Sequence, residues 1–76
     1  MKAYTCQIGN EVDGEIVKPA YSERLYADSL IEAIDRAKAI VNTRAVHEHE
    51  DTVRLIDDEA ELNVAWTRPI EDVRKA

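Results

Sequence analysis

The sequence predicts a small α+β domain of ββαββ order, in which a four-stranded antiparallel sheet carries one amphipathic helix on one face. Three observations predict this fold: an alternating segment near the N-terminus, a helical segment with a capping motif, and a second pair of alternating segments after it. With 76 residues the chain has room for a single domain, which we expect to span residues 1–76.

The first hairpin begins at residues 3–8, where side chains alternate with the period of a strand. Asp13-Gly14 is a turn signal. We expect residues 15–18 to form the return strand, at an edge or broken at Pro19, because proline donates no hydrogen bond to a sheet. An extended path through residues 24–26 then leads to the helix.

The helix is predicted over residues 29–44. Ser29 and Glu32 have the spacing of a capping box, in which each side chain satisfies a free amide of the first turn. Glu32 also stands four residues before Arg36, the favourable orientation for a helical ion pair. The apolar residues recur at helical spacing and form one stripe, made of Leu30, Ala33, Ile34, Ala37, Ile40 and Val41.

The second hairpin is predicted from residues 53–56 and 61–66, across an aspartate-rich turn at residues 57–60. Pro69 ends the pairing, and residues 68–76 are expected to form a loosely ordered tail with one helical turn. The opposite face of the sheet has no second layer, so we expect it to meet water or a second copy. The face under the helix is expected to hold Tyr4, Cys6, Ile8, Leu55, Leu62, Val64 and Trp66.

The negative charge is concentrated in one segment. Residues 45–61 contain seven acidic side chains and one basic side chain, and their net charge of −6 equals that of the whole chain. Such a surface repels phosphate backbones, so we expect no nucleic-acid binding. It suits a basic protein partner or divalent cations, although acidic loops also simply keep small domains soluble. The side chains expected to bind a partner are Glu48, Glu50, Asp57, Asp58 and Glu59.

Both histidines of the chain, His47 and His49, stand in the stretch HEHED. Imidazole and carboxylate groups bind metals, so His47, His49 and Asp51 are a candidate site for zinc, nickel or copper. Residues two apart share a side of a strand but diverge on a helix, and this stretch lies between the two. No fixed spacing such as H-E-x-x-H is present, and a solvated linker is the simpler interpretation.

Catalytic constellations are not evident, and we expect a protein without enzymatic activity and without a cofactor. Cys6 is the only cysteine and alternates with Tyr4 and Ile8 on the expected buried face, which favours a core residue over a reactive thiol. The two glycines do not form a phosphate-binding loop. Ser29 is explained as a helix cap.

Small size favours self-association. A short chain buries a small core and is commonly supplemented by a disulfide, a metal or a partner, and a lone cysteine excludes an internal disulfide. We therefore expect a homodimer that pairs through the open sheet face. No apolar run is long enough for export or for a membrane span, so we expect a cytoplasmic protein without membrane contact.

Two segments resemble short bacterial domains of unknown function that run from a strand hairpin into the motif aDs-eeAi-rA. The matching residues are Ala27-Asp28-Ser29, Glu32-Ala33-Ile34, Arg36-Ala37 and residues 53–62. The first segment is also similar to the helix entry of HicB-type antitoxins, whose small sheet-and-helix domain binds a toxin. Those domains usually have three strands before the helix and one after it, whereas two and two are expected here. The resemblance brings no catalytic residues with it.

The leading hypothesis is therefore a non-enzymatic protein-interaction or regulatory module, dimeric, with its acidic segment available to a basic partner. The alternative is a metal- or small-ligand-binding protein that uses residues 47–51.

Overall fold

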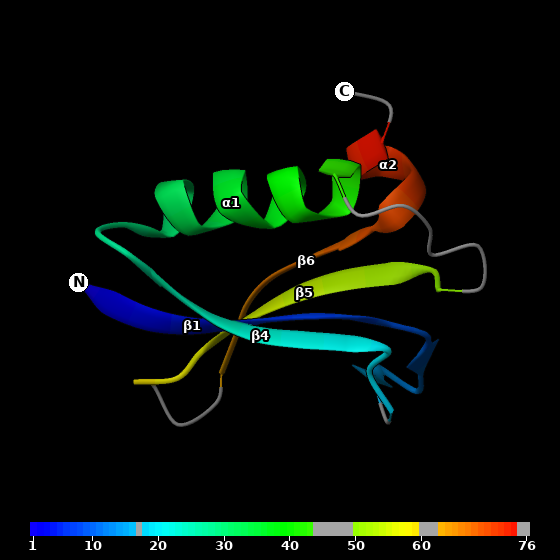
Figure 1. Ribbon diagram of the computed structural model, residues 1–76. Coiled ribbons are helices and arrows are strands. Elements are labelled where there is room, and N and C mark those ends of the chain that lie inside the picture. Colours follow the sequence, from blue (N-terminus) through cyan, green and yellow to red (C-terminus); the bar gives the residue numbers. More distant parts are fainter. Residues whose placement is uncertain (17, 44–49, 60–62, 75–76) are drawn as a thin grey trace.

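The fold is a four-stranded antiparallel sheet with one main helix across one face (Figure 1). The computed structural model describes residues 1–16, 18–43, 50–59 and 63–74. The strands are β1 (Lys2–Gly9), β4 (Tyr21–Ala27), β5 (Thr52–Asp57) and β6 (Asn63–Pro69), in the order β4-β1-β5-β6. The main helix is α1 (Leu30–Thr43), and a short helix, α2 (Ile70–Arg74), packs beside its C-terminal end. The predicted fold class is confirmed.

The strand that returns beside β1 is not the predicted one. β1 pairs with β4 along its length, whereas residues 15–18 were expected as its partner. Within that segment Glu15–Ile16 forms β3, which pairs with β2 (Glu11–Val12) in a separate two-stranded hairpin. The physical reason is length and burial: β4 offers seven residues and buries Leu25 and Ala27 under the helix.

The N-terminus of α1 is capped as predicted. The backbone amide of Glu32 donates to Ser29 Oγ at 3.2 Å, and Glu32 Oε2 accepts from the backbone amide of Asp28 at 3.0 Å. Glu32 also pairs with Arg36 at 3.1 Å. One short motif therefore satisfies two free amides and begins the helical ion pair. Arg44, the expected last residue of the helix, lies outside the described residues.

The core lies between α1 and the sheet. Ala33, Ala37 and Val41 are fully buried, and Ile34 and Ile40 pack partly against them. Leu30, the first member of the predicted stripe, is 38% exposed and contributes little. The sheet and α2 complete the core with Tyr4, Cys6, Ile8, Leu25, Ala27, Val53, Leu55, Ile70 and Val73.

A β-bulge in β6 changes which side chains face α1. Leu55 pairs with Trp66 and Ile56 pairs with Val64, so Ala65 is the extra residue of the bulge. Trp66 therefore packs partly against the core, while Val64 points to the opposite face and is 48% exposed. The expectation that Val64 lines the helix-covered face is wrong, because one inserted residue reverses the alternation. Leu62, expected on the same face, lies outside the described residues.

The segment after Pro69 is part of the core. Pro69 ends β6 as predicted, and α2 follows at once with its acids in the first turn and Arg74 in the last. Ile70 and Val73 are each 3% exposed and lie against α1. The expected loose tail is therefore an ordered turn over residues 70–74, because it carries two apolar side chains at helical spacing. In the described part of the chain, neither α1 nor α2 is long and apolar enough to cross a bilayer.

Candidate functional site

On the sheet face that points away from α1, rows of side chains cross all four strands, and one of these rows lies away from the β2–β3 hairpin. The strand register places Arg24, Thr5, Ile56 and Val64 side by side in that row. Tyr26 lies in the next row and is 50% exposed, close to the 48% of Val64. Exposed apolar groups thus stand on both edge strands, with polar groups between them.

The polar side chains of this row, Thr5 and Arg24, both contact the carboxylate of Asp58. Thr5 Oγ1 lies 2.8 and 2.9 Å from the two carboxylate oxygens of Asp58, and Arg24 Nε lies 3.2 Å from the same group. A hydrogen bond with Tyr26, and then the charge of Asp58, raise the pKa of the Arg24 guanidinium above its ordinary value. No described element covers this surface, the charges of Arg24 and Asp58 cancel on it, and we call it the open face. It consists of Ala3, Thr5, Arg24, Tyr26, Ile56, Asp58 and Val64.

The other half of the same sheet face is covered by the β2–β3 hairpin, which lies on the side away from α1 in Figure 1. Arg54 is 7% exposed beneath it; its Nη2 donates to the carbonyl oxygen of Gly14 at 2.8 Å and lies 3.6 Å from Glu11 Oε2. The expectation that this face has no cover is therefore wrong for the half around Arg54. A buried guanidinium needs acceptors, and the hairpin supplies them to Nη2, whereas Nε is buried without a hydrogen-bond partner among the described residues.

Asp51 fixes the start of this hairpin. Its carboxylate accepts from Thr52 Oγ1 at 2.7 Å and from the backbone amide of Glu11 at 3.1 Å. These two hydrogen bonds, the one from Thr52 first, lower the pKa of Asp51 below its ordinary value. The predicted metal ligand thus has a structural role in the described part of the chain.

The rest of the predicted metal site falls on residues that the structure does not describe. His47 and His49 lie outside the described residues. Among the residues that are described, no three histidine, cysteine or acidic side chains are grouped closely enough to hold a metal ion. The metal site stays a prediction from the sequence.

The predicted partner-binding acids at the β5–β6 turn hold that turn against β1. Asp57 Oδ2 pairs with Lys2 Nζ at 2.8 Å, and this contact raises the pKa of Lys2. Glu59 Oε2 accepts from the backbone amide of Ala3 at 3.1 Å. Glu50 is partly buried, and Glu48 lies outside the described residues. Asp57 and Glu59 thus have internal contacts, and the binding of these acids to a basic partner stays a prediction.

Cys6 lies in the core, as its alternation with Tyr4 and Ile8 predicts. Its side chain is fully buried in the centre of the sheet. Burial, and secondly the charge of Glu23, raise the pKa of the thiol to about 11. The thiol is therefore protonated near neutral pH, which makes it a poor nucleophile.

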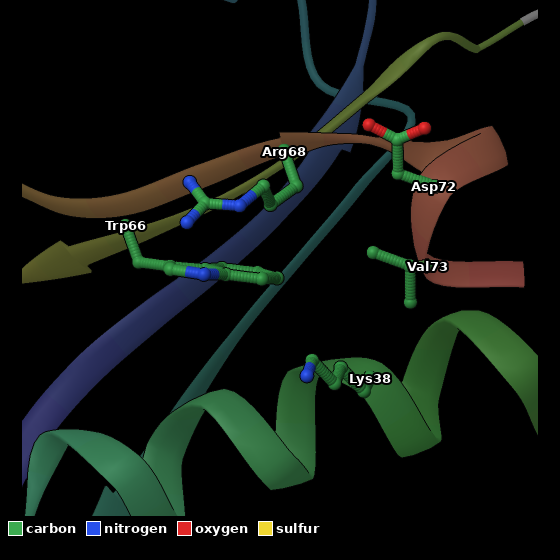
Figure 2. Close-up of a pocket in the computed structure, with 5 residues that line it drawn as sticks. All are labelled: Lys38, Trp66, Arg68, Asp72 and Val73. Carbon is green, nitrogen blue, oxygen red and sulfur yellow. The ribbon is translucent and has the colours of Figure 1, made fainter. Parts of the chain in front are cut away.

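A groove on the helix side of the sheet was not predicted from the sequence. It has a volume of about 230 Å³ and is lined by Lys38 of α1, Trp66 and Arg68 of β6, and Asp72 and Val73 of α2 (Figure 2). The Arg68 guanidinium lies over the Trp66 ring, with its Cζ 5.7 Å from the ring centroid. Its lining combines two cationic side chains, one acidic side chain and apolar groups, which suits a small amphipathic ligand.

One signal for this groove is present in the sequence. Lys38 stands four residues after Ile34 and eight after Leu30, so it continues one row of the apolar stripe. With α2 packed beside α1, Lys38 lines the groove together with Asp72 and Val73 of α2.

Comparisons with protein-family models, with curated proteins and with solved structures gave no match. The similarity of the helix entry to HicB-type antitoxins therefore stays an expectation from the sequence.

Proposed function

We propose that this chain is a non-enzymatic protein-interaction module that pairs with a second copy of itself through the open face. The observation that carries the proposal is the composition of this face. Two half-exposed apolar side chains, Tyr26 and Val64, stand on its opposite edge strands, and the ion pair of Arg24 and Asp58 lies on the same face. Apolar groups beside satisfied polar groups are typical of surfaces that are buried only on association.

Charge favours a second copy as the occupant of this face. The chain carries a net charge of −6, so two copies repel each other over most of their surface. On the open face the charges of Arg24 and Asp58 cancel, which reduces this repulsion there. A two-fold axis through the face would also bring the same patch from each copy together, as symmetric dimers require.

The surface area available on the open face limits how tightly two copies can bind each other. The chain exposes 4877 Å², and a standard interface takes about 800 Å² from each partner. The β2–β3 hairpin covers the part of the sheet face around Arg54, so the remaining surface corresponds to a small interface. We therefore expect a weak dimer, with a dissociation constant on the order of 10 μM, rather than an obligate one.

The test is sedimentation equilibrium of the wild-type chain and two matched variants. Val64→Glu places a charge on the open face, whereas Val12→Glu places the same charge at a 56% exposed valine on the β2–β3 hairpin. We expect the wild type and Val12→Glu to dimerise and Val64→Glu to remain monomeric. A wild type that is monomeric at about 100 μM, or equal dimerisation of both variants, would rule out the proposal.

A further inference from the structure

The groove beside Trp66 is lined by two cations, Lys38 and Arg68, that have no acidic partner among the described residues. Lys2, Arg24, Arg36 and Arg54 each lie near an acid of the chain. By contrast, no acid among the described residues lies within ion-pair distance of Lys38 or Arg68. Because both cations line one groove and neither has a described acidic partner, the groove is a place for an external anion.

The three lining elements bring different chemistry to the groove. Lys38 is exposed on α1, and Arg68 is exposed on β6 and stacked on Trp66. Trp66 is partly buried and Val73 is buried, so both present apolar surface between the cations. Figure 2 shows the carboxylate of Asp72 turned away from α1 and from Lys38. An anionic head and a flat apolar body are therefore accommodated together.

Size and charge narrow the class of ligand. At about 230 Å³ the groove is smaller than the ~300–1,000 Å³ of sites that hold drug-sized molecules. Asp72 at the rim and the net charge of −6 disfavour a doubly charged phosphate. A singly charged carboxylate satisfies both conditions.

We propose that this groove binds a small aromatic carboxylate, with its charge at Lys38 and its ring against Trp66 and Val73. The groove lies on the helix side of the sheet and the open face lies on the other, so this binding is independent of the pairing of two copies.

Benzoate is the probe, and the indole N–H resonance of Trp66 is the reporter, because Trp66 is the only tryptophan in the chain. We expect a saturable shift with a midpoint on the order of millimolar, as suits a ligand of this size. Benzamide keeps the ring without the charge and should give no saturable shift. Inorganic phosphate keeps a charge without the ring and should also give none.

Two lysine variants separate the groove from a general charge effect. Lys38→Gln should raise the benzoate midpoint about threefold, and Lys18→Gln, at an exposed lysine outside the groove, should leave it unchanged. Val64→Glu should also bind benzoate like the wild type, whatever the outcome for pairing. Thermal melts confirm that each variant is folded. A linear response to benzoate, saturation by benzamide or by phosphate, or an unchanged midpoint in folded Lys38→Gln would overturn the proposal.

Discussion

Arg54 Nη2 donates to the carbonyl oxygen of Gly14 at 2.8 Å, across 40 residues of chain. This hydrogen bond ties the two-residue strands of the β2–β3 hairpin to the centre of the sheet. An isolated hairpin of this length is not stable in water, so its position depends on what it contacts. The Arg54 contact, together with the hydrogen bond from the Glu11 amide to Asp51, therefore holds the hairpin over one part of the sheet face.

Arg54→Met should release the hairpin while keeping apolar bulk over the sheet. We expect hydrogen–deuterium exchange at the amides of Val12 and Ile16 to become fast, and the free energy of unfolding to fall by about 1–3 kcal/mol, because a charged hydrogen bond is lost. Arg24→Met is the matched control, since Arg24 pairs with Asp58 away from the hairpin. Unchanged exchange in Arg54→Met would show that the hairpin is held by other contacts.

Gly9→Ala should destabilise the fold through a steric contact with the same hairpin. A Cβ at Gly9 would lie 2.6 Å from Ile16 Cγ2 and 3.2 Å from the Cα of Pro19. We expect a loss of about 1–3 kcal/mol in urea unfolding, with part of it recovered when Ile16→Ala is added. Gly14→Ala meets no atoms but forces φ of +81° on a side chain, so its cost of about 1 kcal/mol should not be recovered by Ile16→Ala. Equal recovery for both glycines would contradict the steric account.

Ser29→Ala should weaken α1 at its N-terminus. The hydrogen bond from the Glu32 amide to Ser29 Oγ is lost, and we expect a decrease of about 1 kcal/mol in the free energy of unfolding. Ser22→Ala, at an exposed position of β4, is the control and should change stability by less than about 0.5 kcal/mol. The same loss in both variants would remove the cap as the cause.

Alkaline pH should destabilise the fold through Cys6. Its pKa is raised from 9.0 to about 11 in the folded chain, so the unfolded chain releases the thiol proton first. The contribution to stability is complete below pH 9 and is lost between about pH 9 and pH 11, on the order of 1 kcal/mol per pH unit. Cys6→Ala lacks this titration, and its urea-unfolding profile should fall less steeply over that interval. Parallel profiles for the two proteins would contradict the account.

The features that the sequence predicts correctly are local ones. Ser29 and Glu32 lie three residues apart, and a capping box depends on that spacing alone. Cys6 alternates with Tyr4 and Ile8, and a strand with one covered face buries such a row. These patterns predict the helix-covered sheet correctly because each depends only on residues that are close together in the sequence.

The features that it misses depend on competition between distant segments. A turn signal precedes residues 15–18 and predicts that they pair with β1. The longer strand β4 pairs with β1 instead. The bulge at Ala65 cannot be read from the alternation of Val64 and Trp66, because these residue types are compatible with a regular strand and with a bulged one. The groove needs α1, β6 and α2 to meet, which no single stretch of sequence encodes.

The central claim, pairing through the open face, is tested most directly by heteronuclear NMR of the wild-type chain diluted from about 1 mM to about 10 μM. Pairing predicts concentration-dependent shifts at Tyr26, Ile56 and Val64, with constant resonances for Lys38 and Val73 on the helix side. Resonances of the open face that stay constant over the whole range would contradict the account.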